Sequence, residues 1–196
     1  KKTKTRTIVR CALIASLYTA VSLVLAPIAF GAVQARVSEA FTLLPVLVPD
    51  AVVGVTLGCF LTNLVGVFTG ANVRLDIVFG TAATLTAALC TRRLARVRLR
   101  GLPVAAAVPP VLINAVVVGA ELAWAFGPRT FAGFLLQAGG VALGQLFSCF
   151  ALGLPLVRII EKTPALRAWS GIERFFPLVP RQKLILSARM AEPTAR

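Results

Sequence analysis

Long apolar runs separated by short polar breaks are the feature that most limits how this chain can fold. Between Cys11 and Ile160, several runs approach 20 residues, which is about the length that an α-helix needs to cross a bilayer core of about 30 Å. Charged residues make up 14% of the 196 residues, whereas a soluble domain usually carries about 25%. The sequence therefore predicts an all-α integral membrane protein.

Six helical spans are predicted within a transmembrane domain of residues 11–160. A basic segment, residues 1–10, precedes this domain, and a basic tail, residues 161–196, follows it. The second span is short and contains Pro45, so Ala40–Phe68 could instead be one kinked helix, which would leave five spans. The six spans are Cys11–Phe30, Ala40–Val48, Ala51–Phe68, Leu75–Leu89, Leu102–Phe126 and Phe131–Ile160.

The distribution of Lys and Arg favours six spans over five. With six spans and a cytoplasmic N-terminus, residues 1–10, 92–100 and 158–196 hold 5, 5 and 8 positive residues, so 18 of the 21 lie on the cytoplasmic side. Cytoplasmic loops of membrane proteins carry such an excess. Five spans would place the arginines of residues 92–100 outside. We therefore expect a six-transmembrane-helix bundle in the plasma membrane, with both termini cytoplasmic.

The composition argues against several soluble functions. A net charge of +14 could indicate binding to nucleic acid. However, the basic residues flank apolar spans and do not alternate with aromatic residues that could stack on bases. The sequence contains no His, the commonest general base and a common zinc ligand. It also lacks a nucleophile–base set and a phosphate-binding glycine loop. We predict no enzyme, no cofactor, no metal and no nucleic-acid partner, and a chain that cannot energise transport by itself.

Polar residues in or beside the spans are the candidates for function, because ionisable groups at membrane depth are costly. Most of them fall in the outer half of the predicted bundle, which indicates a shared outward-facing cavity. An unpaired carboxylate at Glu121 requires a partner or a ligand, and we expect Arg36 to pair with one of the acids. The candidate substrate-binding residues are Arg36, Glu39, Asn63, Asp76, Glu121 and, near the midplane, Gln145.

Structural roles are the alternative for several of these candidates. Arg36 and Glu39 could cap helices at the membrane interface. Asp76 could favour a helix N-terminus through the helix dipole, and Asn63 could bridge two helices. Glu121 is the hardest to explain in this way.

Small residues recur at the spacing that lets helices approach closely in lipid. Gly54 and Gly58 are four residues apart, as are Gly140 and Gly144, and ordinary internal packing explains both pairs. A third stripe of small residues lies on the first span, where it either packs internally or contacts a partner helix. It consists of Ala12, Ser16 and Ala20.

Four motifs together resemble the QueT family of queuosine-precursor transporters. Arg36-Val37-Ser38-Glu39 is similar to the Arg-[Ile/Val]-Ser-Glu signature of that family. The resemblance extends from about Ile14 to Leu156. The other three motifs are Leu57-Gly58-Cys59 with Asn63, Leu75-Asp76-Ile77-Val78-Phe79-Gly80, and Gly119-Ala120-Glu121-Leu122.

The resemblance implies the substrate-binding S component of an energy-coupling factor transporter. Such six-helix proteins capture a micronutrient outside and dock on a transmembrane T component with two ATPase subunits. Their first helix contacts the T component through an Ala-x-x-x-Ala-like motif, whose spacing Ala12, Ser16 and Ala20 share. The implied substrate is a 7-deazaguanine-type base. The family usually has Gly-Glu-Leu where this chain has Gly144-Gln145-Leu146, so a charge that could pair with a cationic aminomethyl group is missing.

The chemistry of a guanine-like base suits the candidate acids, since adjacent N–H donors match a carboxylate that accepts two bonds. Glu121 or Glu39 could supply it. Alternatives are an S component for another vitamin or metabolite, a subunit without a ligand, and a membrane-embedded lipid-modifying enzyme. A lipid-modifying enzyme would need an acidic metal-binding repeat near the cytoplasmic ends of the spans. The only acids there are Asp50 and Glu161, which argues against this alternative.

Overall fold

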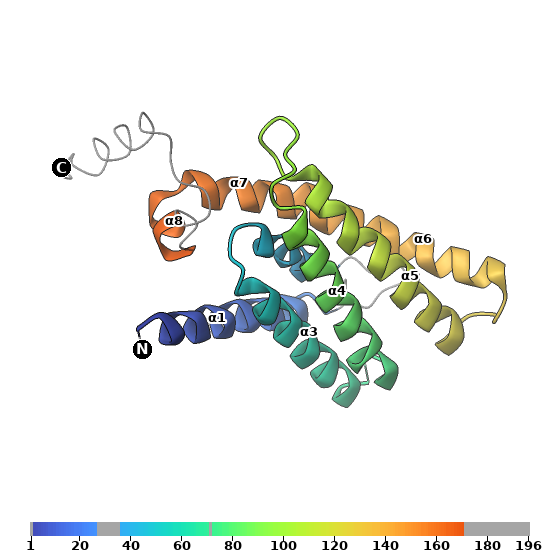
Figure 1. Ribbon diagram of the computed structural model, residues 1–196. Coiled ribbons are helices and arrows are strands. Elements are labelled where there is room, and N and C mark those ends of the chain that lie inside the picture. The colour runs from blue at the N-terminus through green and yellow to red at the C-terminus, as the bar shows by residue number, and fades with distance from the viewer. Residues whose placement is uncertain (1, 27–35, 71, 171–196) are drawn as a thin grey trace.

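Most of the part of the chain that the structure describes is helical (Figure 1). The computed structural model describes residues 2–26, 36–70 and 72–170, and no strand occurs among them. The α-helices are α1 (Lys2–Val24), α3 (Ala51–Phe68), α4 (Phe79–Arg93), α5 (Val108–Ala125), α6 (Phe131–Leu146), α7 (Leu154–Lys162) and α8 (Pro164–Ser170). Three 3-10 helices, η1 (Val37–Val46), η2 (Arg74–Ile77) and η3 (Val104–Ala107), and the π-helix η4 (Phe147–Gly153) complete the described elements.

Within the described residues, four helical stretches are long and apolar enough to cross a membrane. They are Lys4–Val24, Ala51–Phe68, Val104–Ala125 and Phe131–Lys162. The two other predicted spans fall short of that length, because η1 has 10 residues and α4 has 15. The structure thus supports a helical membrane protein with four apolar spans, and the count of six crossings stays a prediction.

Helix α3 has its predicted bounds, whereas α1 differs from the prediction. It begins at Lys2 and not at Cys11, and it ends at Val24; residues 27–30 of the predicted span lie outside the described residues. No Gly or Pro interrupts residues 2–10, so nothing there stops a helix. The basic residues mark the edge of the apolar layer and not the start of the helix.

The last three predicted spans are each subdivided. Leu75–Leu89 becomes η2 and α4, and Leu102–Phe126 becomes η3 and α5. Helix α5 carries its two prolines in the first turn, where their missing N–H groups are not needed. The predicted Phe131–Ile160 becomes α6, η4 and α7, a stretch of 32 residues. At about 1.5 Å per residue it measures about 48 Å, so it extends beyond a bilayer core of about 30 Å.

The second predicted span is a 3-10 helix, and this corrects the α-helix expected over Ala40–Val48. η1 covers Val37–Val46, and eight of its ten residues are buried. At about 2.0 Å per residue it covers about 20 Å. It contacts α1, α3, α4, α7 and η4, so it runs through the inside of the bundle. Glu39, which the sequence placed in a polar break, is therefore a buried helical residue.

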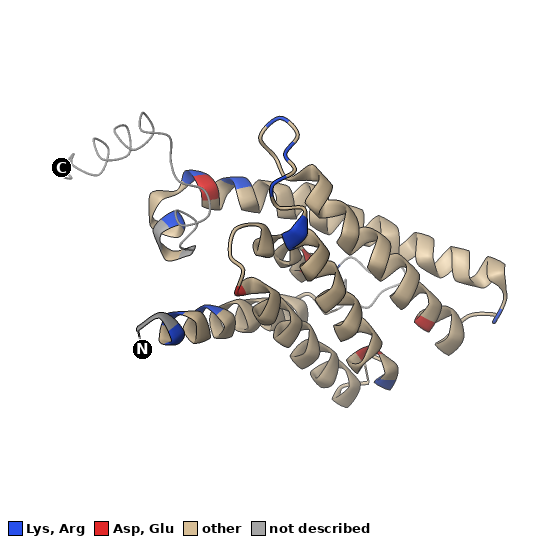
Figure 2. Ribbon diagram, in the orientation of Figure 1, with Lys and Arg blue, Asp and Glu red and all other residues tan. Residues whose placement is uncertain are grey.

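The basic segments of the described chain gather at one end of the bundle (Figure 2). Arg98, in the loop after α4, pairs with Glu161 near the end of α7 at 2.6 Å. Arg10 in α1 lies 3.6 Å from Asp50, just before α3. Three regions that the charge distribution assigns to the same side of the membrane thus lie at the same end of the fold.

The glycine pair on α3 is packed against another helix, whereas the stripe of small residues on α1 is exposed. A Cβ atom on Gly58 would lie 2.6 Å from Tyr18 Cβ, and one on Gly54 would lie 2.9 Å from Ile14 Cβ, so this pair lets α3 pack closely against α1. The stripe on α1 is exposed and faces away from the bundle, which excludes internal packing for it within the described chain. Its residues are Ala12, Ser16 and Ala20.

Replacing Gly58 by Ala should destabilise the bundle, because the new methyl group would also meet the backbone oxygen of Ala15 at 3.0 Å. Forcing two packed helices apart costs about 1–3 kcal/mol. Gly139→Ala is the matched control, since nothing lies within 4 Å of that position and Ala favours a helix over Gly by about 0.5–1 kcal/mol. Thermal unfolding in detergent should show a lower midpoint for Gly58→Ala only; equal midpoints would contradict the close α1–α3 contact.

Candidate functional site

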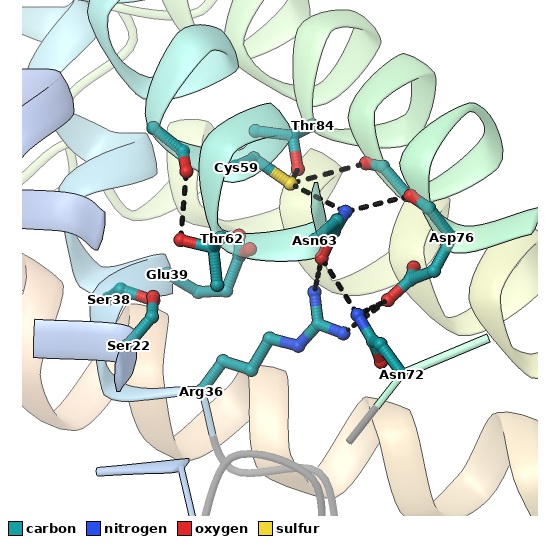
Figure 3. A network of polar contacts seen from close by, with 12 residues as sticks. Ser22, Arg36, Ser38, Glu39, Cys59, Thr62, Asn63, Asn72, Asp76 and Thr84 are labelled. Carbon is teal, nitrogen blue, oxygen red and sulfur yellow. Dashed lines mark hydrogen bonds and ion pairs between the residues drawn. The ribbon is translucent and has the colours of Figure 1, made fainter. Parts of the chain in front are cut away.

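A buried arginine organises the polar interior of the bundle (Figure 3). Arg36 is 6% exposed. Its Nη2 atom donates to Asp76 Oδ2 at 2.7 Å, and its Nη1 atom donates to Asn63 Oδ1 at 3.2 Å. The expected pairing of Arg36 with an acid is therefore present, and the acid is Asp76.

Two asparagines complete this network. Asn63 on α3 donates through Nδ2 to the backbone oxygen of Asp76 at 2.7 Å. Asn72 donates through Nδ2 to Asn63 Oδ1 at 3.1 Å and to Asp76 Oδ2 at 2.5 Å. A buried ion pair is tolerated only when additional hydrogen bonds satisfy its remaining atoms. The two amides supply part of them: Asn63 Oδ1 accepts from Arg36 and Asn72 donates to Asp76 Oδ2, whereas Asp76 Oδ1 is buried without a hydrogen bond among the described residues. Asn63 thus bridges elements and serves the ion pair as well.

The local backbone brings these residues together. Arg36 is extended, with φ −75° and ψ 97°, directly before η1, and Asp76 lies in the 3-10 turn η2 and not at an α-helix start. Gly80 in α4 lies against the network: a Cβ atom there would lie 2.2 Å from Asp76 Oδ1 and 2.9 Å from Asn63 Nδ2. The missing side chain of Gly80 therefore makes room for the carboxylate.

Glu39 lies one 3-10 turn beyond Arg36. Side chains three residues apart eclipse one another in a 3-10 helix, so Arg36, Glu39 and Thr42 follow one side of η1. The hydroxyl of Tyr18 donates to Glu39 Oε1, and Thr42 donates to the backbone oxygen of Glu39 at 2.6 Å. The other carboxylate oxygen, Oε2, is buried and accepts no hydrogen bond within the described part of the chain.

The π-helix η4 holds the far side of this site against η1. Cys149 in η4 places its sulfur 3.8 Å from the backbone oxygen of Glu39 and 3.6 Å from Gln145 Oε1. Gln145, at the end of α6, is 4% exposed. Single π turns inside α-helices occur frequently at functional sites. The turn after Gln145 thus directs α6 and η4 toward the carboxylate on η1.

A small internal cavity lies between η1, α4, α5 and α6. Its volume is about 10 Å³, which admits about one water molecule. Asn114 Nδ2 is buried without a hydrogen bond among the described residues, as is Glu39 Oε2. Buried polar atoms without partners are costly, so this central cavity offers a donor and an acceptor to a ligand. Its lining comprises Arg36, Glu39, Gly80, Thr84, Asn114, Val118, Val141 and Gln145.

Glu121 is within electrostatic reach of Asp76 and Arg36, but it does not line the central cavity, whereas the sequence led us to expect a single shared cavity. It is 6% exposed, and neither carboxylate oxygen has a hydrogen bond within the described residues. It lines a separate groove together with Phe79 and Trp124. Depth along the bundle was predicted from the sequence, but the side of α5 on which Glu121 lies depends on how α5 packs against α4.

Several residues of the site were missed from the sequence. Tyr18 is the only tyrosine in the chain and is 0% exposed. Its hydroxyl group lies within an apolar helix and needs a hydrogen-bond partner there, so the sequence could have identified it. Asn114 stood out in the sequence as an amide within an apolar run, but it was not assigned to the site. Asn72 carried no signal, because polar residues are ordinary in loops. Thr84, which donates to Cys59 at 3.2 Å, resembled any other helical threonine.

The arrangement suits binding of a polar ligand inside an apolar bundle. An acceptor, a donor and the amide of Gln145 converge on one cavity, while Asp76 balances the charge of Arg36. Among the described residues, no group of three or more His, Cys, Asp or Glu side chains could hold a metal ion.

Comparison with known proteins identifies one relationship. The family model of the QueT transporter matches residues 8–162, which include every residue of the network and of the cavity. Neither the curated proteins nor the solved structures gave a match.

Replacing Asp76 by Asn should destabilise the protein strongly, because Arg36 would keep a buried charge without its counter-ion. Removing one partner of a buried pair costs about 3–5 kcal/mol. Asp50→Asn is the matched control: its pair with Arg10 is longer, at 3.6 Å, and partly exposed, so its loss should cost about 0–1 kcal/mol. Unfolding in denaturant measures both variants, and equal losses would contradict a central role for the Arg36–Asp76 pair.

Proposed function

The chain belongs to the QueT transporter family, and we propose that it is the substrate-binding S component of an energy-coupling factor transporter that imports a 7-deazaguanine-type queuosine precursor. The central cavity carries this proposal. It places a carboxylate oxygen and an amide nitrogen without hydrogen bonds among the described residues inside an apolar bundle. Such polar groups are costly at membrane depth, so their presence indicates a functional site.

The polar groups of the cavity complement the edge of a guanine-like base. Oε2 of Glu39 can accept an N–H group, and a hydrogen bond to a charged acceptor is about twice as strong as a neutral one. Asn114 Nδ2 can donate to the carbonyl oxygen of the base, and Gln145 can both donate and accept. Because Asp76 neutralises Arg36, Glu39 supplies the net charge, and Gln145 adds none. These groups favour a base rich in N–H donors over a cationic ligand that needs two carboxylates to balance its charge.

A base is larger than the present cavity, so binding requires its walls to separate. The cavity admits about one water. The two sides of the cavity differ in packing. On one side, α4 and α5 contribute the small or short residues Gly80, Thr84 and Asn114. On the other side, Glu39 of η1 and the adjacent Arg36 are held by hydrogen bonds to Tyr18 and Asp76. We propose that α4 and α5 move and that η1 stays in place.

We propose six membrane crossings, with both termini in the cytoplasm and the protein in the plasma membrane. Four are the apolar stretches; η1 and η2–α4 would provide the others. Non-α backbone is tolerated at membrane depth where protein surrounds it, and η1 is buried on most sides. The inward face of α4 consists of small and hydroxyl residues, which need not be apolar enough to face lipid. They are Gly80, Ala83, Thr84, Ala87, Ala88 and Thr91.

The exposed stripe Ala12, Ser16 and Ala20 supports a partner helix. Small residues on a lipid-facing surface permit a close helix contact, and nothing within the described chain covers them. We propose that this face binds the transmembrane T component, which carries two ATPase subunits. Such partners would supply the energy for release of the substrate.

Replacing Glu39 by Gln should weaken binding of 7-deazaguanine. The variant keeps an oxygen for the hydroxyl of Tyr18 but loses the charge, which is worth about 1.5–3 kcal/mol in a hydrogen bond, or roughly 10- to 150-fold in Kd. Calorimetric titration of the purified protein measures the change. Glu161→Gln is the control, because that carboxylate pairs with Arg98 in the basic end of the bundle.

Two outcomes would contradict different parts of this proposal. If the wild-type protein binds the base and Glu39→Gln binds it equally well, the central cavity is not the binding site. If the wild-type protein binds no 7-deazaguanine but binds another vitamin, the S-component role stands and the substrate is wrong.

Replacing Ser16 by Leu should reduce uptake while leaving binding to the isolated protein intact. Overpacking a close helix contact costs about 1–3 kcal/mol, so assembly with the T component should weaken roughly 5- to 150-fold. Thr86→Leu is a matched control: Thr86 is also exposed on a helix and also donates to the backbone four residues earlier at 2.8 Å, as Ser16 does. Unchanged uptake by Ser16→Leu in cells that contain the whole transporter would show that this face contacts lipid only.

A further inference from the structure

The groove that holds Glu121 lies on the outer surface between η2–α4 and α5. Its volume is about 480 Å³, within the range of roughly 300–1,000 Å³ of small-ligand sites. The walls are apolar and partly aromatic: Phe79 is 49% exposed and Trp124 is 59% exposed. Leu75, Val116 and Ala120 contribute further apolar surface.

Among the described residues that line this groove, Glu121 alone has an ionisable side chain. It is 94% buried, because its relative exposure is 6%, and both of its carboxylate oxygens lack a hydrogen bond among the described residues. A buried charge without partners is strongly unfavourable. N–H donors or a cation on a ligand would remove that cost, and the flat apolar walls would hold the body of a planar molecule.

Trp124 is oriented by a cation at the outer end of α5. The guanidinium of Arg129 lies 4.0 Å from the centroid of the Trp124 ring, a distance typical of cation–π contacts. The contact holds the ring as a wall of the groove. It also shows that this ring can accept a positively charged group.

A wall formed by α4 and α5 lies between the groove and the central cavity. Consecutive residues of each helix face the two sides: Phe79 lines the groove and Gly80 lines the cavity, while Val117 lines the groove and Val118 lines the cavity. Helices α4 and α5 pack directly against each other. Separation of these two helices would therefore join the two spaces.

We propose that this groove is an entry site, where Glu121 holds a planar base through an ammonium group or adjacent N–H donors before the base passes between α4 and α5 into the central cavity. The proposal rests on the proposed function, because it concerns the same substrate. It assigns successive roles to two carboxylates that form no salt bridge within the described residues: Glu121 captures the base in the groove, and Glu39 holds it inside.

Tryptophan fluorescence tests the entry site directly. The chain has two tryptophans, so Trp169→Phe leaves Trp124 as a reporter in the groove. The full chain in nanodiscs would be titrated with 7-deazaguanine and with its 7-aminomethyl derivative, which differ by one positive charge. The aminomethyl derivative should quench Trp124 at the lower concentration, and Glu121→Gln should raise that concentration roughly 10- to 100-fold and remove the difference between the probes.

Two further variants separate the groove from the cavity. Ala120→Phe should fill the groove and abolish quenching, since Ala120 lines the groove and is exposed. Glu39→Gln should keep the Trp124 response while calorimetric affinity falls, because its carboxylate lies on the other side of the α4–α5 wall.

Three results would overturn the entry site. Calorimetric binding of a base with no Trp124 response, and with no effect of Glu121→Gln, would remove the groove and leave the proposed function standing. Quenching by vesicles rich in ethanolamine lipid, but by neither base, would make the groove a lipid site. Absence of any base binding by calorimetry and by fluorescence would overturn the proposed function together with the entry site.

Discussion

A guanidinium charge inside an apolar bundle is the constraint on which the rest of the structure depends. Arg36 is tolerable because Asp76 balances its charge, Asn63 accepts a hydrogen bond from Arg36, and Asn72 donates one to Asp76. These partners come from α3, η2 and the loop between them. The start of η1 is therefore fixed against α3 and η2, and the 3-10 geometry of η1 continues the polar row from Arg36 to Glu39 inside the bundle.

That ion pair leaves two carboxylates in unlike surroundings. Glu39 faces a cavity of about one water, with Tyr18, Asn114 and Gln145 around it. Glu121 faces an open apolar groove with aromatic walls. The same two helices, α4 and α5, bound both spaces. A ligand that binds both carboxylates in turn must pass between these helices, so movement of α4 against α5 is the conformational change that the architecture makes available.

The sequence predicted the helical class, the bounds of α3 and the grouping of the basic regions, because these follow from apolar length and from charge. It also identified Arg36, Glu39, Asn63, Asp76, Glu121 and Gln145 as polar residues in a costly place, and the motifs that carry the family relationship. It missed Tyr18 and Asn72, and it merged the cavity and the groove into one site. Depth can be counted along a helix, but the direction of a side chain around the helix depends on its neighbours.

By itself the sequence determined that most of this chain must lie in an apolar environment, because runs of nearly 20 apolar residues have no other stable setting. It also determined which few polar side chains must find partners there. Only the tertiary structure decided which residues are the partners of these side chains. Asp76, and not Glu39 or Glu121, pairs with Arg36 because η2 approaches the start of η1 where Gly80 leaves room for the carboxylate. The selection depends on close packing between segments distant in sequence, a property that no local pattern of residues encodes.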